Sequence, residues 1–459
     1  MAVDPSTASS ERATMVTTGG PGNAPWMLLV LFTVPLIGYV HRLIINILID
    51  PISQELAITD TQASFLQGPP FAVAYALMVV PMGLLADRGN RLLLLGAGAV
   101  VWSFGTLACG LAPDYGWLFA ARLVVGIGEA ALTPAVVSFI GDSFVGDRRG
   151  FAMGVFFTGI NAGFSSAYAI GGITLEAAEA GAFAGVPTLG ELSAWRQVFA
   201  ILSVPGLLIP LLMFTLREPA RASAARPASA LQTLSRLFRP SSYSLVLLLL
   251  VLLIALLAIA DNGIYAWLPR LLARVYELKA SHIGIALGII VAVGGFVGGP
   301  LGGILSDRFA IRFGGAAPLL VILVGAAVAS AAVPLFATGV LPLVYLATGI
   351  WVIALVSTTS SIYTFIAVAA RPRLRGVSAS VVTSVSSLIG LGFGPTVIAL
   401  TLERFDFARA RVDLAIVAAA LPLCLAALAL AVTVWGLRRR LSHDQNREDT
   451  AAALSEPVS

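Results

Sequence analysis

Charged residues are scarce in this chain, and their scarcity limits the classes of protein to which it can belong. Only 11% of the 459 residues are charged, whereas 58% are hydrophobic. A soluble domain carries about 25% charged residues, and a monomer of the present composition would expose more apolar surface to water than soluble monomers tolerate. The lipid bilayer is therefore the expected solvent.

Cysteine and histidine are also rare. The two cysteines, Cys109 and Cys424, both lie in apolar runs and do not suggest a disulfide scaffold or a metal site. The three histidines, His41, His282 and His443, are spread over distant segments, and the chain has no His-x-x-x-His or aspartate-rich motif. Because an intramembrane enzyme needs a nucleophile–base pair or a metal set, we expect no enzyme, no metal and no cofactor.

Long apolar runs, by contrast, are abundant. A helix that spans a bilayer needs about 20 mostly apolar residues. Splitting the runs at polar residues and at Gly or Pro breaks predicts an all-α polytopic membrane protein with twelve transmembrane helices. The expected helices cover residues 25–49, 61–86, 91–112, 117–140, 149–172, 195–216, 242–268, 280–306, 315–337, 341–370, 376–402 and 411–437.

The arginines cluster at one side of these helices. Arg88, Arg91, Arg148 and Arg308 fall on this side, whereas acidic residues prevail in the loops of the other side. Because cytoplasmic loops carry the excess of Lys and Arg, we expect both termini in the cytoplasm and the protein in the cell (inner) membrane. The net charge of +4 follows from this loop pattern and does not indicate nucleic-acid binding.

Two polar tails and a polar linker divide the chain. Residues 1–24 lack the features of a signal peptide and are expected to form a disordered cytoplasmic tail. Residues 217–241 are rich in Pro, Ser and Arg without a spanning stretch, which predicts a cytoplasmic linker. It separates two six-helix bundles, 25–216 and 242–437, and residues 438–459 form a second cytoplasmic tail.

An internal repeat supports this division. Gly-Leu-Leu-Ala-Asp-Arg at 83–88 ends the second helix, and Gly-Ile-Leu-Ser-Asp-Arg at 303–308 ends the eighth, which is the second helix of the other bundle. Parallel repeats about an axis along the membrane normal are a known transporter architecture. The matched positions therefore predict two pseudo-symmetric halves.

These motifs resemble those of the major facilitator superfamily. The loop at 83–88 is similar to the superfamily's signature loop between helices 2 and 3, and Arg217-Glu218-Pro219 resembles a familiar element at the end of helix 6. A second signature is matched by Arg122-x-x-x-Gly126-x-Gly128-Glu129-Ala130. The resemblance covers essentially the whole spanning region and implies a central path surrounded by helices 1, 4, 5, 7, 10 and 11.

Within the superfamily, the chain resembles the Spinster branch, whose members are linked to sphingolipid and lysophospholipid export. The matching residues are Tyr39 and Arg42, Asp87-Arg88-Gly-Asn90-Arg91, Val125-Gly126-Ile-Gly128-Glu129-Ala130, and Ile140-Gly141-Asp142-Ser-Phe144. The chain departs from the branch at His41, where the family pattern Asn-Tyr-x-Asp-Arg has an aspartate. This departure puts a coupling role for a helix-1 carboxylate in doubt, and Glu129 is then the carboxylate that is expected to couple transport to protons.

Charges in the fourth helix mark the candidate site. An ionisable side chain at mid-bilayer costs about 2.5–3.5 kcal/mol on insertion scales, so such residues are functional hypotheses. Arg122 and Glu129 are seven residues apart, which places them on one helix face with Gly126 and Thr133. We expect both charges in the proton-coupling and substrate site. The alternative is a structural pair in which they neutralise each other.

The first helix adds a second polar face. Tyr39, Arg42 and Asn46 lie on it at spacings of three and four residues, and we expect them to bind substrate, with Arg42 also in proton coupling. His41 lies on the adjacent apolar face. It is a proton-coupling candidate at the edge of the cavity, and side-chain packing is the alternative role.

Polar residues in four further helices complete the expected substrate path. They are Asn161, Asp261, Asn262, Tyr265, Ser357, Ser361 and Thr383. Two alternatives stay open. Asp261 is placed near the outer end of its predicted helix, where water can solvate it, and Ser and Thr side chains can bond their own backbone carbonyls.

The repeated loops are expected to control conformation. The predicted gate residues are Gly83, Asp87, Arg88, Arg91, Asp142, Arg148, Asp307 and Arg308. Gly83 would let a neighbouring helix approach, and Asp87 would gain from a nearby helix N-terminus. The arginines would bind carboxylates across the halves and hold the cytoplasmic side shut in one state. A purely topogenic charge cluster is the alternative.

Together these features predict a proton-coupled secondary transporter that works by alternating access. Burial disfavours the ionised form of Glu129, a neighbouring arginine favours it, and an arriving anion that claims the arginine changes the balance. Arginine suits phosphate through bidentate hydrogen bonds. With the Spinster resemblance, this implies an amphipathic anionic lipid such as a lysophospholipid or a sphingoid phosphate.

Other transport functions stay open. One alternative is a proton symporter or exporter of small organic anions, sugar acids or drugs, and another is a channel, although a channel would usually lack duplicated halves. Besides its substrate, the expected partners are protons and membrane lipids, and a monomer is expected.

Overall fold

The described part of the chain consists of helices and the turns that connect them. The computed structural model describes residues 24–144, 147–219, 241–370, 375–405 and 411–455, with side chains as far as Arg438 except at positions 147, 375 and 376. The predicted tail 1–24 and linker 217–241 lie almost wholly outside these residues.

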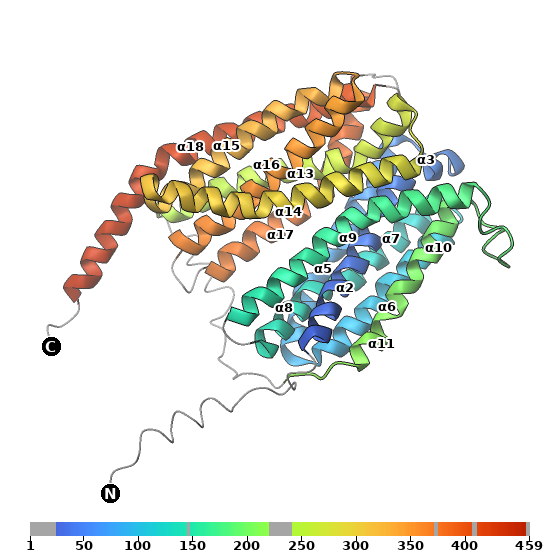
Figure 1. Ribbon diagram of the computed structural model, residues 1–459, viewed down its shortest axis with the longest axis horizontal. Coiled ribbons are helices and arrows are strands. Elements are labelled where there is room, and N and C mark those ends of the chain that lie inside the picture. The colour runs from blue at the N-terminus through green and yellow to red at the C-terminus, as the bar shows by residue number, and fades with distance from the viewer. Residues whose placement is uncertain (1–23, 145–146, 220–240, 371–374, 406–410, 456–459) are drawn as a thin grey trace, which may run out of the picture.

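Two groups of helices follow each other along the chain (Figure 1). The N-terminal half contains α2 (Ala24–Leu43), α3 (Ile45–Glu55), α4 (Asp60–Gln67), α5 (Pro69–Arg88), α6 (Arg91–Gly110), α7 (Tyr115–Glu129), α8 (Leu132–Ser143), α9 (Asp147–Glu179), α10 (Ala194–Leu207) and α11 (Ile209–Phe214). The C-terminal half contains α13 (Ser242–Tyr276), α14 (Ala280–Phe313), η1 (Gly314–Ala316), α15 (Ala317–Ala332), η2 (Val333–Ala337), α16 (Leu341–Ala369), α17 (Arg375–Arg404) and α18 (Val412–Ser455).

These helices confirm the predicted class of an all-α membrane protein. By length and composition, ten stretches of the described residues are able to cross a membrane. One of them, Ala280–Ala337, contains both α14 and α15, and α9 is a further long helix outside the ten. Counting α14 and α15 separately and adding α9 is consistent with the twelve predicted spans.

Several spans differ from the continuous helices that the sequence predicts. The first is interrupted at Ile44, the second at Gly68, and the fourth at Ala130 and the residue after it. Two interruptions lie within two residues of Arg42 and Glu129. Irregular backbone at membrane depth is tolerated where it is buried in protein or lines a cavity, so these interruptions already point to the site.

Two helices extend beyond their predicted ends. α13 continues to Tyr276, eight residues past the predicted limit at 268. α18 continues to Ser455 and therefore includes most of the predicted tail 438–459. The backbone of that tail is thus helical as far as Ser455.

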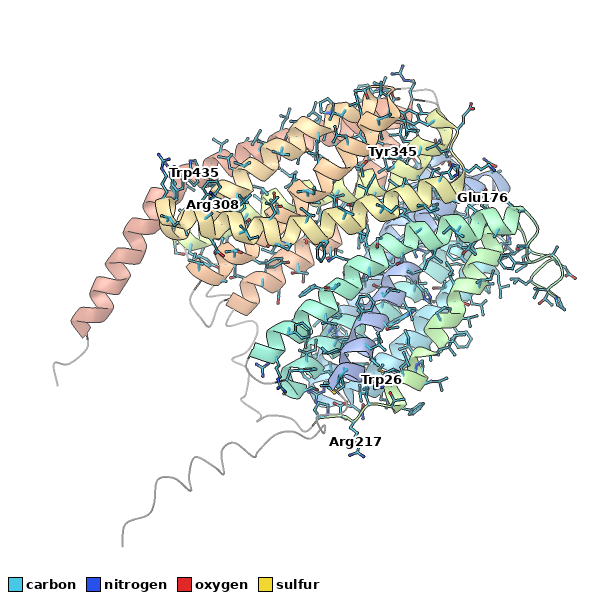
Figure 2. The ribbon with its side chains drawn as sticks, in the orientation of Figure 1. Trp26, Glu176, Arg217, Arg308, Tyr345 and Trp435 are labelled. Carbon is cyan, nitrogen blue, oxygen red and sulfur yellow. The ribbon has the colours of Figure 1, made fainter. Side chains whose placement is uncertain are left out.

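The two halves meet at one end and diverge at the other. Figure 1 shows α9 and α14 crossing near one end, while the opposite ends of the halves point apart. In Figure 2, Glu176 lies where the halves meet, whereas Arg217 and Arg308 lie at the separated ends. We name the end with Glu176 the closed end and the end with Arg217 and Arg308 the open end.

Small residues allow the helices to pack closely at the closed end. A Cβ atom on Gly284 of α14 would lie 2.2 Å from the carbonyl oxygen of Tyr168 in α9. On the facing surface of α9, a Cβ on Gly172 would lie 2.2 Å from the carbonyl oxygen of Ala280 in α14. Because glycine lets helix backbones approach closely in membranes, this α9–α14 contact depends on the absence of these side chains.

Candidate functional site

A cavity of about 190 Å³ lies between the halves. Its N-terminal wall comes from α2 and α9 and consists of Tyr39, Arg42, Leu43 and Phe164. Its C-terminal wall comes from α13, α16 and α17 and consists of Ile254, Ala258, Asp261, Asn262, Leu355, Thr359, Tyr363, Val382, Ser386, Ser387 and Leu391. The lining combines two charged groups and one amide with hydroxyl, aromatic and aliphatic side chains.

Arg42 is the cation in the N-terminal wall. Its Nη2 lies 2.5 Å from Oε1 of Glu129. The guanidinium carbon lies 4.5 Å from the ring centres of Tyr39 and Phe71 and 5.4 Å from that of Tyr75. Ring faces attract a cation within about 6 Å, so three aromatic rings and one carboxylate surround the charge of Arg42.

Glu129 itself is hidden behind Arg42. Its side chain is 1% exposed, and it lies at the last residue of α7, where the fourth span is interrupted. Arg42 lines the cavity. A ligand in the cavity therefore reaches Glu129 through the arginine that neutralises it.

Arg122 has a different partner from the one predicted. Its Nε donates to the carbonyl oxygen of Leu66 at 3.2 Å, and its Nη2 donates to the carbonyl oxygen of Arg42 at 3.1 Å. Leu66 needs this donor because Pro70, four residues later, has no backbone N–H. Among the described residues Arg122 forms no ion pair, so the alternative of a neutral Arg122–Glu129 pair is wrong for this conformation.

Hydrogen bonds between the halves end the cavity toward the closed end. Gln67 donates across the halves to the carbonyl oxygen of Ala266 at 2.9 Å and, within its own half, to the side chain of Asn46 at 3.3 Å. The Tyr168 hydroxyl donates to the carbonyl oxygen of Tyr265 at 3.0 Å. These contacts place Asn46 and Tyr265 in a seal between the cavity and the closed end.

An ion-pair network lies beyond this seal. Arg270 of α13 contacts Asp50 at 3.0 Å and Asp60 at 2.9 Å, and it donates to Ser53 at 2.7 Å. Arg274, one turn later, contacts the same two aspartates at 2.7 and 3.3 Å. Two cations of one half thus balance two anions of the other, and the network holds the closed end together.

The C-terminal wall carries a carboxyl group without a cation. Asp261 lies near the middle of α13 and lines the cavity, and its Oδ1 accepts a hydrogen bond of 2.9 Å from the Trp351 indole. The interpretation that it lies near the outer end of its helix is wrong, because α13 continues to Tyr276. Asn262, beside it, bonds the carbonyl oxygen of Ala258 at 2.9 Å.

This fold and cavity can be compared with known proteins. A family model described as Major Facilitator Superfamily matches residues 27–395. The chain belongs to the Major Facilitator Superfamily. The predicted resemblance to that superfamily is therefore confirmed, and the all-helical two-half architecture is that of the family.

The chain is also similar in sequence to individual members of the superfamily. An MFS-type efflux pump of Mycolicibacterium smegmatis is 24% identical over 296 residues, which are 64% of this chain and 65% of that protein. The sphingosine-1-phosphate transporter SPNS2 of Danio rerio is 25% identical over 255 residues, which are 53% of this chain and 47% of that protein. The matched stretches thus span less than two thirds of these curated relatives.

Solved structures extend the likeness to almost the whole chain. Two crystal structures show a bacterial homolog to the human lysosomal transporter Spinster, inward-facing, one unoccupied and one occupied. Each is 27% identical, has a TM-score of 0.76, and covers 93% of this chain and 98% of its own. The predicted resemblance to Spinster proteins is confirmed.

In this facilitator, His41 lies away from the cavity. Its Nε2 is 2.6 Å from the carbonyl oxygen of Leu202 in α10, and a Cβ on Gly206 would lie 2.6 Å from its ring. The ring is therefore packed between helices of the N-terminal half on the side away from Arg42. This position matches the packing role and gives no contact to the Arg42–Glu129 pair.

Several predicted substrate residues lie outside the cavity lining. Ser357 donates to the carbonyl oxygen of Gly298, and Ser361 donates to that of Ser357, so both lie in the seam between α14 and α16. Asn161 donates to a carbonyl of its own helix, and Thr133 lies on α8 past the interruption. Thr383 lies next to the cavity lining, because its hydroxyl is 2.6 Å from the hydroxyl of Tyr363, which lines the cavity.

The predicted gate residues lie at the open end of the facilitator fold. Arg91 forms ion pairs with Asp142 and, at 2.5 Å, with Glu218. Asp142 belongs to the N-terminal half and Glu218 follows its last helix, so the expected contact of Arg91 across the halves is not made in this conformation. The exposed members of the set are Asp87, Arg88, Arg148, Asp307 and Arg308.

Two details of the gate prediction need correction. A Cβ on Gly83 would meet only Pro134, at 4.0 Å, so no close helix approach requires glycine there in this conformation. Asp87 lies in the last turn of α5 rather than at a helix N-terminus, and the helix dipole does not favour a carboxylate at that end.

Sequence reasoning missed the contribution of the second span. Gln67, Phe71 and Tyr75 belong to α4 and α5, and they contact Asn46 or Arg42. The superfamily resemblance had excluded this span from the central path. The aromatic residues have no signal of their own in the sequence, because an aromatic ring in an apolar run predicts ordinary core packing.

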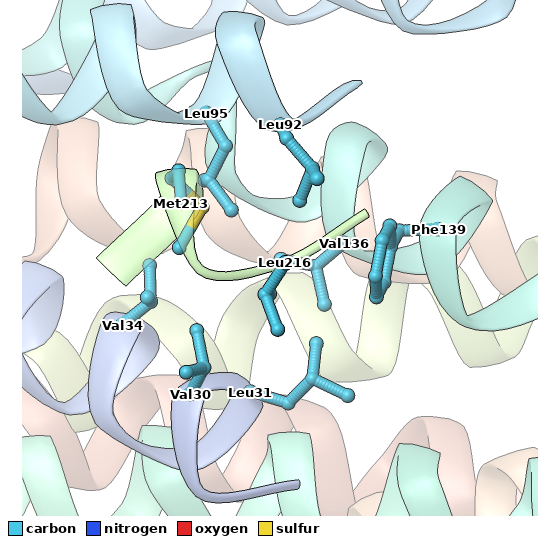
Figure 3. Close-up of a pocket in the computed structure, with 9 residues that line it drawn as sticks. All are labelled: Val30, Leu31, Val34, Leu92, Leu95, Val136, Phe139, Met213 and Leu216. Carbon is cyan, nitrogen blue, oxygen red and sulfur yellow. The ribbon is translucent and has the colours of Figure 1, made fainter. Parts of the chain in front are cut away.

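An apolar crevice near the open end is separate from this site. The crevice has a volume of about 10 Å³. Figure 3 shows the residues that line it, which are Val30, Leu31, Val34, Leu92, Leu95, Val136, Phe139, Met213 and Leu216. These aliphatic and aromatic side chains offer no polar group to a ligand, and the crevice is a packing gap within the N-terminal half.

Proposed function

We propose that this facilitator is a proton-coupled secondary active transporter of an amphipathic anionic lipid, such as a lysophospholipid or a sphingoid phosphate, and that it works by alternating access. The observation that carries the proposal is the Arg42–Glu129 ion pair of 2.5 Å. One member lines the cavity and the other is buried behind it.

The ion pair links cargo to protons through a shared arginine. When a phosphate group binds Arg42, Glu129 loses the cation that stabilises its ionised form, and its burial then favours protonation. Conversely, a proton on Glu129 frees Arg42 to bind an anion. Because each ligand changes the affinity for the other, their binding is coupled.

The cavity lining supports an amphipathic substrate. Arg42 and Asn262 provide polar groups, whereas Ile254, Leu355 and Leu391 provide an aliphatic surface for an acyl or alkyl chain. The names of the relatives agree, since one is a sphingosine-1-phosphate transporter. The expectation that the chain is not an enzyme follows from its family, because the relatives are named as transporters and an efflux pump.

The arginine pattern supports an orientation. Arg88, Arg148 and Arg308 lie at the open end, whereas the aspartates of the ion-pair network lie at the closed end. By the positive-inside rule, the open end faces the cytoplasm, together with both termini, in the cell membrane. The conformation is then inward-facing, and a monomer suffices because the cavity lies within one chain.

Transport in liposomes with an imposed pH gradient tests the proposal. Glu129→Gln, which cannot release a proton, is expected to abolish gradient-driven accumulation of a labelled lysophospholipid while exchange at equal pH continues. Glu191→Gln, an exposed change of the same kind outside the cavity, is the control. Full gradient dependence in the Glu129→Gln protein would remove Glu129 from the mechanism.

A second substrate class has its own support. The chain is also similar to an MFS-type efflux pump, which favours export of small organic anions or drugs as the other candidate. A binding screen that compares lysolipids with small carboxylates and sugar acids distinguishes the two. Saturable binding of the carboxylates alone would contradict the lipid proposal.

A further inference from the structure

An arginine follows the repeated loop in each half, and the two arginines have different surroundings at the open end. In the N-terminal half, Arg91 is 1% exposed and pairs with Asp142 and Glu218. In the C-terminal half, Arg312 is exposed and forms no ion pair with any residue that the structure describes. The second copy of the repeat therefore has the cation without its carboxylate partners.

The sequence explains this difference. Glu218 follows the sixth span of the N-terminal half, whereas residues 438–440, which follow the sixth span of the C-terminal half, are all arginine. Asp142 lies at the end of the fourth span, whereas residues 370–376, which follow α16, include three arginines and no acidic residue. The two positions that supply anions in one half thus supply cations in the other.

The nearest acidic residue along the chain is Asp307, five residues before Arg312. Residues three or four apart are neighbours on a helix surface, and a spacing of five places these two side chains on different faces of α14. This end of the C-terminal half therefore suits an anion from outside the chain.

An aromatic pair holds two arginines where α14 and α18 meet. The Phe313 ring packs edge-on against the Trp435 ring, with 5.3 Å between the ring centres. The guanidinium carbon of Arg312 lies 5.6 Å from the centre of the Phe313 ring, and that of Arg438 lies 4.2 Å from the centre of the Trp435 ring. Because ring faces attract cations, the pair keeps both guanidinium groups at this junction.

The junction lies at the depth of the lipid headgroups. α14 ends one residue after Arg312, and the apolar span of α18 ends at Arg438. Figure 2 shows Trp435 at this end of the C-terminal half, and tryptophan is typical of the boundary between hydrocarbon and headgroups. Ile311, beside Arg312, is 92% exposed, so an apolar side chain is available there for contact with lipid.

We propose that Arg312 and Arg438 bind the phosphate of an anionic phospholipid, such as phosphatidylglycerol, in the leaflet at the open end. Arginine binds phosphate through two parallel hydrogen bonds, and a headgroup of net negative charge is favoured because a zwitterionic headgroup brings its own cation. Neither arginine lines the cavity between the halves. The lipid is therefore a bound partner of the transporter and is distinct from its cargo.

Lipid binding to the purified full-length protein in detergent tests the proposal. The probes are phosphatidylglycerol and phosphatidylcholine with the same acyl chains, and native mass spectrometry counts the lipid retained during a titration. Arg312→Gln combined with Arg438→Gln is expected to weaken phosphatidylglycerol binding about tenfold or more and to leave phosphatidylcholine binding unchanged. The control combines Arg148→Gln with Arg217→Gln, two exposed arginines of the N-terminal half at the same end, and should change binding less than about twofold.

A second pair of substitutions separates a shaped site from general surface charge. Arg312→Lys combined with Arg438→Lys keeps both charges and loses the planar groups that stack on the rings and bind phosphate with two bonds. We expect this protein to bind phosphatidylglycerol severalfold more weakly than the wild type. Wild-type affinity in the lysine protein, or equal weakening by the control pair, would overturn the site.

Two measurements on the wild-type protein complete the test. Equal binding of phosphatidylglycerol and phosphatidylcholine would overturn the preference for an anionic headgroup. Glycerol phosphate, which has a phosphate but no acyl chains, is expected not to displace the bound phosphatidylglycerol. Displacement at an equal concentration would show that the arginines bind a soluble phosphate, and would overturn the lipid as the ligand.

Discussion

At the scale of single residues, Arg42 and Arg122 have the same charge and different roles. Arg42 faces the cavity within a ring of aromatic side chains and pairs with Glu129. Arg122 bonds two carbonyl oxygens at interruptions of the first and second spans. The first is placed to exchange its partner for a ligand, while the second holds the backbone that positions the first.

This difference predicts that Arg122→Lys lowers stability. A lysine keeps the charge, but its single ammonium cannot reproduce the planar fork that serves Leu66 and Arg42. A buried carbonyl left without a donor costs about 1–3 kcal/mol, so the thermal midpoint of unfolding in detergent should fall. The exposed Arg148→Lys is the control. Equal midpoints for the two variants would show that the carbonyl bonds do not stabilise the fold.

At the scale of helices, the α9–α14 contact depends on glycine. Gly284→Ala would place a methyl group 2.2 Å from the Tyr168 carbonyl oxygen, so the two helices must separate. We expect this variant to lose most transport activity in liposomes because the closed end cannot close. Gly303→Ala, in the same helix with no atom within 4 Å of the new Cβ, is expected to retain activity. Similar activity of the two variants would contradict the argument.

The sequence was sufficient to predict the helices and the faces that bear charge, but it did not predict which side chains pair. Twelve spans, two halves and the polar faces of Arg42 and Glu129 follow from hydropathy and helical periodicity. The Arg42–Glu129 pair joins different helices, so its choice over Arg122–Glu129 depends on packing. The interruptions at Ile44 and Ala130 were missed because they contain no strong breaker, and the one at Ala130 alters the register of Thr133.

The ions at the closed end were missed for a related reason. Arg270 and Arg274 are basic residues on the side where acidic loops prevail, so they are exceptions to the pattern from which the orientation is predicted, and Asp50 and Asp60 belong to those acidic loops. A topological rule counts charges on each side of the membrane and does not describe their contacts. The structure shows that these exceptions join the halves.

At the scale of the whole molecule, alternating access requires that contacts at one end be exchanged for contacts at the other. The ion pairs of Asp50 and Asp60 with Arg270 and Arg274 stabilise the present conformation. The exposed gate residues, among them Arg88 and Arg308, are available for contacts that form when the open end closes. The equilibrium between the conformations is thus set by the difference between two sets of ionic contacts.

Asp60→Asn is therefore expected to shift the protein toward a conformation open at the end that is now closed. The change removes one of the two anions that Arg270 and Arg274 share and leaves Asp50 alone to balance both cations. Spin labels at the exposed positions Thr188 and Thr338, one in each half, report the separation of the closed end, in a background without Cys109 and Cys424. The population with the longer distance should rise severalfold.

Asp114→Asn, which removes a charge of the N-terminal half outside this network, should leave the distribution unchanged. If both variants give the wild-type distribution, the ion pairs do not control the equilibrium, and closure is governed instead by helix packing such as that between α9 and α14.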